Sequence, residues 1–110
     1  MKNTEMSFII IYITHENEME AQKLANQLIE ERLVACANLF PIQSMYWWQG
    51  AIAKEGEWVS IVKTQTHLWG KLAQRVEELH PYEVPCILKI EAAANQKYED
   101  WIVESTWTNT

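Results

Sequence analysis

Apolar residues recur along the chain with two different periods, and these predict strands that alternate with helices. The segment Ser7–Ile13, SFIIIYI, is short and rich in β-branched and aromatic residues, so it predicts a strand that is apolar on both faces. Thr14 is the expected cap of a helix that runs to about Glu31. One face of this helix carries an apolar stripe made of Ala21, Leu24, Ala25, Leu28 and Ile29.

A long hairpin is expected in the middle of the chain. Gln49-Gly50 is typical of a tight turn between two antiparallel strands. Pro41 indicates a bulge or an edge position in the first arm, and Gly56 indicates a bulge or local bend in the second. The arms are predicted as Val34–Leu39 continued by Ser44–Trp48, and as Ala51–Ala53 continued by Glu57–Thr64.

A second helix, a strand and a final helix complete the predicted elements. The second helix begins at Thr66 and ends at His80, because Pro81 disfavours helical geometry in the residue before it. A strand is predicted over Ile87–Ile90, and the final helix over Asn95–Ser105. The apolar stripe of the second helix is Leu68, Leu72, Val76 and Leu79, with Trp69 and Ala73 beside it.

The order β-α-β-β-α-β, followed by a helix, predicts an α+β fold of the ferredoxin-like, split βαβ kind in one domain of residues 1–110. Such a fold has helices on one face of an antiparallel sheet, and the other face is open. The first strand is apolar on both faces, and the hairpin is long for so small a domain. These features favour a homo-oligomer; the other interpretation is a lone domain whose final helix covers the sheet.

The amino-acid composition argues against some classes of binding partner. The net charge is -6, with 15 acidic against 9 basic residues, which argues against binding nucleic acid or an anionic membrane. No apolar run approaches the roughly 18 residues of a membrane span, and the N-terminal stretch reads as a strand and not as a signal peptide. Cys36 and Cys86 are too few for a disulfide framework, so reduced thiols and a cytoplasmic location are expected. Six tryptophans are many for a small core and are typical of an interface.

The segment LHPYEVPCIL carries the candidate chemistry. Pro81 and Pro85 restrict the backbone around His80, Tyr82 and Glu83, which lowers the entropic penalty of binding a ligand. An imidazole nitrogen and a carboxylate suit a divalent transition metal. The alternative is a plain helix-to-strand connection, in which His80 interacts with the helix dipole, Tyr82 packs and Glu83 pairs with a lysine.

Other residues are weaker candidates. Two cysteines are too few for an iron–sulfur cluster, the glycines are scattered, and no Gly-x-Ser-x-Gly segment is present, so no local signature of an enzyme is found. Cys36 is either a small buried hydrophobic residue or a metal ligand. Lys63 either extends to the surface or points its charge into a ligand cleft. His15 and His67 flank the predicted helix starts and are expected on the surface.

Four segments, EERLVACANLFPIQSMYWWQG, EWVSIVKT, ELHPYEVPCIL and YEDWI, resemble in this order the CutA divalent-cation tolerance proteins. The resemblance covers nearly the whole chain. It implies a cytoplasmic, ferredoxin-like homotrimer that is built by strand pairing of the hairpin arms between subunits. It also implies a link to copper and other divalent ions, an architecture like that of PII signalling proteins, and no enzymatic activity.

The resemblance also implies a site. Ile13 stands where some relatives have a cysteine, and Cys86 stands where many have a residue without a thiol, so a copper site made of thiols does not carry over whole. The expected function is binding of Cu²⁺ or another divalent ion without an organic cofactor; the alternative is a PII-like signalling or structural scaffold trimer that binds a small ligand or a protein. The expected metal ligands are His80, Glu83 and Cys36, and the expected ligand cleft contains Tyr82, Lys63, Trp48 and Trp101.

Overall fold

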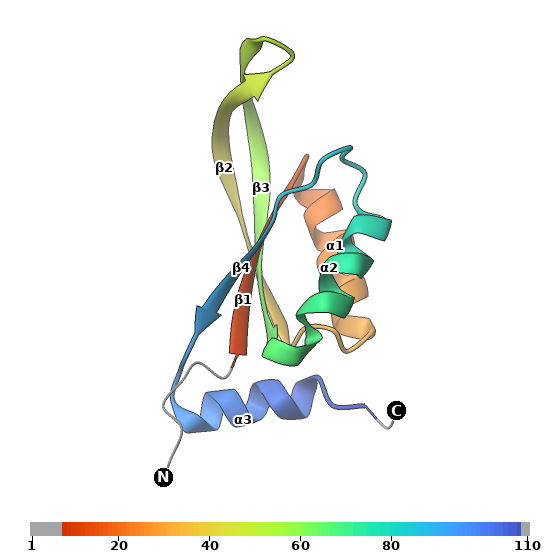
Figure 1. Ribbon diagram of the computed structural model, residues 1–110, viewed down its shortest axis with the longest axis vertical. Helices are drawn as coiled ribbons and strands as arrows, with labels where there is room; N and C mark the ends of the chain where they lie inside the picture. The colour runs from red at the N-terminus through yellow and green to blue at the C-terminus, as the bar shows by residue number, and fades with distance from the viewer. Residues whose placement is uncertain (1–7, 109–110) are drawn as a thin grey trace.

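The computed structural model describes residues 8–108 of the chain. Its elements follow the predicted order of strands and helices, and Figure 1 shows their arrangement. They are β1 (Phe8–His15), α1 (Glu18–Glu30), β2 (Cys36–Trp48), β3 (Ala51–Gln65), a 3₁₀ turn (Thr66–Leu68), α2 (Trp69–Leu79), β4 (Ile87–Ala92) and α3 (Gln96–Ser105). Ser7, the predicted first residue of β1, lies outside the described residues.

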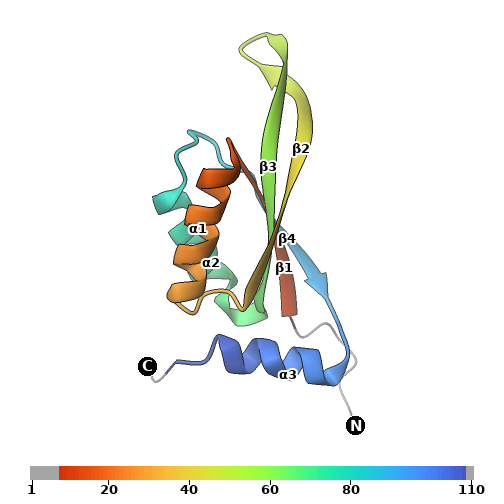
Figure 2. The same ribbon diagram turned by 180° about the vertical axis from the view of Figure 1, so that it is seen from behind.

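The strands form one antiparallel sheet in the order β2-β3-β1-β4. Helices α1 and α2 lie side by side on one face of this sheet, and α3 lies across the end at which β1 begins (Figures 1 and 2). The hairpin of β2 and β3 extends beyond the other two strands. This arrangement confirms the α+β class and the antiparallel sheet.

The core lies between the sheet and the two helices. Alternate residues of β1, namely Ile9, Ile11 and Ile13, are buried in one cluster with residues of both helices. Side chains of a strand alternate between its faces, so Ile10 and Tyr12 point to the other face of the sheet. The remaining members of the cluster are Leu24, Leu28, Val34, Val62, Leu72 and Val76.

The start of α1 differs from the prediction. Thr14 does not cap the helix, because β1 continues through Thr14 and His15, which both pair with β3. Asn17 is the cap, and its side chain accepts a hydrogen bond of 2.9 Å from the backbone N–H of Glu20. The buried stripe has four residues and not five, since Ile29 is exposed.

The hairpin arms are more regular than predicted. The β2–β3 register runs without interruption, so neither Pro41 nor Gly56 forms a bulge. The edge interpretation of Pro41 is confirmed, because β2 is an outer strand of the sheet. The predicted turn at Gln49-Gly50 is also confirmed: both residues have a positive φ, 52° and 83°, which is typical of a type I′ turn.

The second half of the chain follows its predictions closely. The 3₁₀ turn at Thr66–Leu68 precedes α2, and His80 leaves the helix in an extended conformation, as Pro81 requires. Leu72 and Val76 are buried, whereas Leu79 is exposed at the helix end. Helix α3 begins at Gln96, one residue after the predicted start at Asn95, and buries Ile102.

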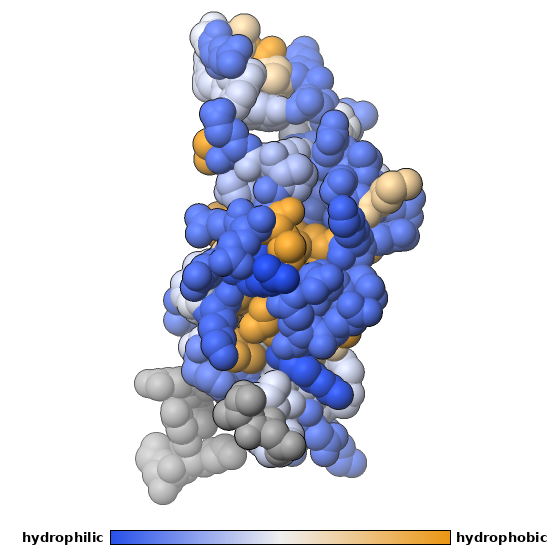
Figure 3. All heavy atoms as spheres, turned by 90° about the vertical axis from the view of Figure 1, so that its right-hand side faces the viewer, coloured by the Kyte–Doolittle hydropathy of each residue, from blue (hydrophilic) through white to orange (hydrophobic). Residues whose placement is uncertain are grey.

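The second face of the sheet is covered only in part. Tyr98 of α3 packs edge-on against Phe8, with ring centroids 6.3 Å apart, at one end of the sheet. On the same face Leu88, Ile90 and Phe40 remain 52%, 50% and 36% exposed. By contrast, the side that carries α1 and α2 is mostly hydrophilic, with a narrow hydrophobic band (Figure 3). The final helix therefore does not cover the open face of the sheet by itself.

Candidate functional site

A network of buried polar side chains lies where β1 ends. Nε2 of His15 is 2.8 Å from Oγ of Ser60 on β3, across the sheet. The ring of His15 stacks on that of His80, which follows α2, with centroids 5.4 Å apart and planes 17° from parallel. His15 is only 1% exposed, so the expectation of a surface residue was wrong. Because β1 extends past Thr14, His15 belongs to the sheet and not to a helix start.

Both ring nitrogens of His80 are hydrogen-bonded. Nε2 donates to the carbonyl oxygen of Thr14 at 2.7 Å, and Nδ1 accepts from the backbone N–H of Tyr82 at 3.1 Å. Since a carbonyl can only accept, the proton of the ring is on Nε2 and the lone pair is on Nδ1. In this conformation neither nitrogen is free to coordinate a metal, and the ring anchors the loop that follows.

The same loop is anchored a second time through Tyr82. Its hydroxyl donates to Oε2 of Glu57 on β3 at 2.6 Å, and its ring lies 4.7 Å from that of His80, edge-on. Burial, followed by the hydrogen bond to Glu57, raises the pKa of Tyr82 above its usual range. Burial also raises the pKa of the Cys86 thiol, and the charge of Glu57 adds to the effect. Tyr82 is thus neutral at physiological pH and acts as a hydrogen-bond donor.

The imidazole of His15 is held in its neutral form. Burial, and then the neighbouring His80, lower its pKa to about 4, although Glu57 acts in the opposite direction. A cavity of about 120 Å³ lies beside the histidine pair. Its walls are formed by the end of β1, by one face of α1 and by the end of α2 with the two residues that follow it, namely by His15, Glu20, Lys23, Leu24, Gln27, Leu79, His80 and Pro81.

Glu83 is the exposed carboxylate of this loop. It makes no hydrogen bond or ion pair with any other residue in the range 8–108. Pro81 and Pro85 flank it, and the anchors at His80 and Tyr82 immediately precede it. Of the two predicted ligands on the loop, Glu83 is therefore the one with unoccupied lone pairs.

The other predicted site residues lie elsewhere. Cys36 and Lys63 are cross-strand partners at the end of the sheet near α3. Sγ of Cys36 is 3.5 Å from Oη of Tyr98, and Nζ of Lys63 is 5.8 Å from the centre of the Tyr98 ring. Trp101 lies beside the same ring, with centroids 5.6 Å apart. Trp48 ends β2 at the tip of the hairpin.

Within one chain the predicted site thus falls into three places. Cys36, Lys63 and Trp101 surround Tyr98 at one end of the sheet, whereas His80 and Tyr82 are at the other end and Trp48 is at the hairpin tip. In the described part of the chain no three histidine, cysteine, aspartate or glutamate side chains are grouped so that they could hold a metal ion.

Three residues of the network were missed from the sequence: His15, Ser60 and Glu57. Ser60 and Glu57 lie within EWVSIVKT, in which the sequence analysis assigned a role only to Lys63. No local pattern distinguishes them. The alternation of side chains along a strand predicts on which face of the sheet a residue lies, but not which residues pack against it. His80 and Tyr82 reach these three residues only because the chain folds back onto the sheet after α2.

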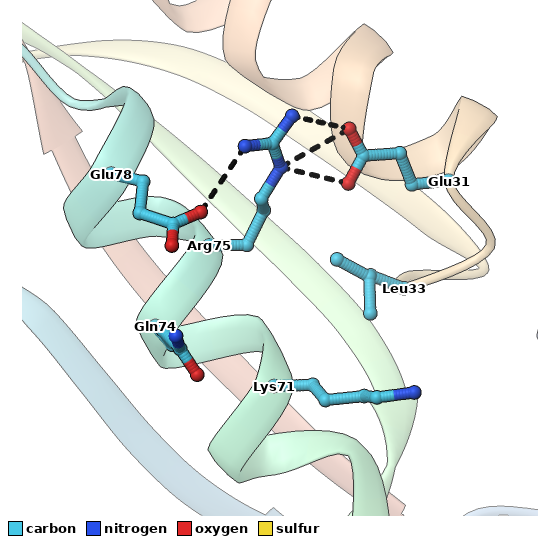
Figure 4. Close-up of a pocket in the computed structure, with 6 residues that line it drawn as sticks. All are labelled: Glu31, Leu33, Lys71, Gln74, Arg75 and Glu78. Atoms are coloured by element: carbon cyan, nitrogen blue, oxygen red, sulfur yellow. Dashed lines mark hydrogen bonds and ion pairs between the residues drawn. The ribbon is translucent and has the colours of Figure 1, made fainter.

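A second hollow, of about 330 Å³, lies between the end of α1 and α2 (Figure 4). Arg75 bridges it: its guanidinium donates to both carboxylate oxygens of Glu31 at 2.8–3.1 Å and to Glu78 at 3.2 Å. The hydrogen bonds from Arg75 are the main reason why the pKa of Glu31 is lowered. This arginine is therefore committed to an ion pair that joins the two helices. Leu33, Lys71 and Gln74 complete the lining.

No helix in residues 8–108 has both the length and the apolar character that crossing a membrane requires.

Comparisons with known proteins agree with the fold. The model of the family described as CutA1 divalent ion tolerance protein matches residues 9–105. The divalent-cation tolerance protein CutA of Pyrococcus horikoshii is 42% identical over 99 residues, which cover 89% of this chain and 97% of that protein.

Solved structures give the same result. CutA from Synechococcus elongatus superposes with a TM-score of 0.89 at 34% identity, covering 97% of this chain and 95% of that one. The periplasmic divalent cation tolerance protein CutA from Archaeoglobus fulgidus gives a TM-score of 0.89 at 37% identity, covering 91% and 99%. The molecule is thus a small α+β protein of the divalent-cation tolerance class. It belongs to the CutA1 divalent ion tolerance family.

Proposed function

We propose that this protein binds copper or another divalent ion and thereby takes part in the response to metal ions. The observation that supports this function best is Glu83, an exposed carboxylate without a partner in the described chain, on a loop fixed by two prolines and two anchors. A fixed ligand loses little conformational entropy when it binds an ion. The proposed role is binding, without catalysis and without an organic cofactor.

The proposed metal ligands are Glu83, His80 and Cys36. His80 can coordinate through Nδ1 only if the backbone N–H of Tyr82 moves away, which weakens binding. Cys36 lies at the opposite end of the sheet, so it can join the loop only across a contact between subunits. In the same way, the proposed cleft that holds Tyr82, Lys63, Trp48 and Trp101 requires more than one chain.

We therefore propose a homotrimer of ferredoxin-like subunits. Three features support it: the exposed apolar residues on the second face of the sheet, the unpaired outer edges of β2 and β4 in the described chain, and the projecting hairpin. The hairpin tip exposes large apolar side chains, with Trp47 at 74%. A long outer strand readily pairs with a second chain, which buries such surfaces.

A copper titration of the metal-free protein by calorimetry tests the metal site. We expect weak binding at pH 7.5, because both nitrogens of His80 are already hydrogen-bonded. His80→Ala and Glu83→Ala are each expected to weaken binding, whereas His67→Ala, at an exposed position, is the control. Equal affinities of the wild type and of the two loop variants would exclude this loop as the site.

A PII-like scaffold that binds a small ligand or a protein without a metal is the alternative. It is favoured by the two hydrogen bonds that occupy both nitrogens of His80. Absence of copper binding by the assembled protein, together with a rise in melting temperature with a non-metal ligand, would support this alternative.

We also propose a cytoplasmic location, on the basis of two cysteines that are free thiols in the structure. The Archaeoglobus fulgidus relative is named as periplasmic, so the compartment needs its own test. Fractionation of cells that express the tagged protein should recover it with cytosolic markers; recovery in another compartment would contradict this proposal.

A further inference from the structure

The cavity of about 120 Å³ beside the histidine pair has a buried polar group in its wall. His15, only 1% exposed, lines the cavity and is bound through Nε2 to Oγ of Ser60. Its other ring nitrogen, Nδ1, makes no hydrogen bond within residues 8–108. In that range the one fully buried polar side-chain atom without a partner belongs to Thr64, so Nδ1 still meets solvent. This nitrogen is therefore available to a ligand in the cavity.

Nδ1 of His15 can either donate or accept a hydrogen bond. The hydroxyl of Ser60 donates to Nε2 or accepts from it, depending on which ring nitrogen carries the proton. When Nε2 accepts, Nδ1 carries the proton and donates, and in the other tautomer Nδ1 accepts. Since the pKa of His15 is lowered to about 4, the ring is neutral at physiological pH. The wall thus offers one uncharged polar contact that adapts to the ligand.

Two opposite charges line the side of the cavity that α1 forms. Glu20 and Lys23 are three positions apart, on the same face of the helix. Neither side chain makes a hydrogen bond or an ion pair within residues 8–108, and they do not pair with each other. A molecule that carries both an ammonium and a carboxylate group can therefore pair with both.

The remaining walls are mostly apolar and limit the size of a ligand. Leu24, Leu79 and Pro81 contribute apolar surface, and both ring nitrogens of His80 are already hydrogen-bonded. An apolar cavity of about 150 Å³ accommodates benzene, which has six non-hydrogen atoms. The cavity next to His15 is slightly smaller, so it suits a molecule of about five or six such atoms.

The charges around the cavity disfavour simple ions. An anion that approaches Lys23 also meets the carboxylate of Glu20, and Glu57 is close enough to act on His15. A cation that approaches Glu20 meets the ammonium group of Lys23. In a zwitterion each charged group finds an opposite charge and the molecule as a whole is neutral, so neither repulsion opposes its entry.

We propose that this cavity binds a small zwitterion of the α-amino acid class. Its ammonium group pairs with Glu20, its carboxylate pairs with Lys23, and Nδ1 of His15 supplies a further hydrogen bond. The site needs no metal ion, so it goes beyond the function proposed above and does not depend on it.

An NMR titration of the whole metal-free protein with glycine and with L-alanine at pH 7.5 tests the site. The signals of the α1 amide groups and of the His15 ring report on the cavity. Acetate and methylammonium carry one charge each, and L-tryptophan is too large, so these serve as comparison ligands. Lys23→Met and Glu20→Gln each remove one charge and keep the length of the side chain. The matched controls are Lys97→Met and Glu30→Gln, at exposed positions outside the cavity.

We expect glycine and alanine to bind with a dissociation constant on the order of 1 mM, because so few atoms make contact. The three comparison ligands should bind at least about tenfold more weakly. Lys23→Met and Glu20→Gln should each weaken glycine binding by about 3–10-fold, whereas the control variants should bind like the wild type. If one cavity variant does not fold, the other decides alone.

Binding of acetate or methylammonium as tight as that of glycine would overturn the zwitterion class. Wild-type affinity in Lys23→Met and Glu20→Gln, or an equal loss in the control variants, would place the ligand elsewhere and overturn the inference. Absence of saturable changes at α1 and His15 would show that the cavity holds only water, and would refute it. The copper titration tests the proposed function separately, so failure of one does not imply failure of the other.

Discussion

His15 is the clearest case of a side chain whose chemistry is set by its surroundings. A buried imidazole between a hydroxyl and a second imidazole cannot readily take up a proton, which is why its pKa falls to about 4. The same ring in a solvent-exposed position, such as His67, is not subject to this burial. The environment of His15 therefore differs from that of His67 because of burial and neighbouring groups, although the residue type is the same.

The stability of the metal-free protein should depend on pH through His15. In the unfolded chain His15 binds a proton below about 6.5, whereas in the folded protein it does so only near 4. Its contribution is therefore fully present above pH 6.5 and is lost as the pH falls from 6.5 towards 4, by a total of about 3 kcal/mol. Urea unfolding at pH 7.5, 6 and 4.5 measures this loss.

The control for this prediction is His15→Asn, which keeps a hydrogen-bonding side chain but does not titrate. Its unfolding free energy should vary less across the same window than that of the wild type, and His67→Asn should behave like the wild type. An equal pH dependence in His15→Asn and the wild type would show that other groups dominate.

Thr64 is a buried residue whose hydroxyl group finds no hydrogen-bond partner in the described chain. In the described chain Oγ1 of Thr64 is the one buried side-chain oxygen or nitrogen without a hydrogen-bond partner. Thr64→Val replaces this hydroxyl by a methyl group of similar shape, so we expect it to stabilise the fold by about 1 kcal/mol. Thr66→Val, at an exposed position, should change little. A lower denaturation midpoint for Thr64→Val than for the wild type would contradict this reading of the core.

At the level of elements, α1 depends on its cap. Asn17→Ala removes the acceptor for the N–H of Glu20 and should destabilise the protein by about 1 kcal/mol. Asn26→Ala, at an exposed position inside the same helix, makes the same chemical change without affecting a cap and should be neutral or stabilising. Thermal melts followed by circular dichroism give the comparison, and equal losses in both variants would exclude a role for the cap.

The hairpin depends in a similar way on its turn. Gly50 has a φ of 83°, a conformation that a residue with a side chain adopts only with strain, so Gly50→Ala should cost about 1 kcal/mol. Gly56 has no such φ, and a methyl group there would meet nothing within 4 Å. Gly56→Ala is thus the matched control and should be neutral or slightly stabilising. If both variants melt at the same temperature, the turn does not limit hairpin stability.

For the molecule as a whole, the assembly should add to its stability. A trimer gives a mass near three times 12.9 kDa in light scattering, and its melting temperature, followed by tryptophan fluorescence, should rise with protein concentration. Leu88→Lys places a charge on the exposed apolar face of the sheet and should lower both values. Met19→Lys, at an exposed position on α1, is the control. A monomer with a melting temperature independent of concentration would contradict the proposed assembly.

Much of the fold could be predicted because its signals are local. The apolar periods of SFIIIYI and of the helices, the proline after His80 and the turn at Gln49-Gly50 each act within a few residues of chain. The errors at Thr14 and Gly56 have one cause: a strand ends where its partner strand stops pairing, and that partner is far away in the sequence. Pairing with β3 extends β1 to His15, and the uninterrupted pairing of β2 with β3 leaves no bulge at Gly56.

For the candidate site, too, some features follow from the local sequence and others only from the tertiary structure. The sequence by itself determined that His80, Tyr82 and Glu83 sit on a restrained loop, because proline geometry is a property of neighbouring residues. Only the tertiary structure decided that His80 is bound at both nitrogens, that Tyr82 is tied to Glu57, and that Cys36 lies at the other end of the sheet. The hydrogen bonds of the candidate site join residues up to 66 positions apart in the sequence, and no local pattern contains them.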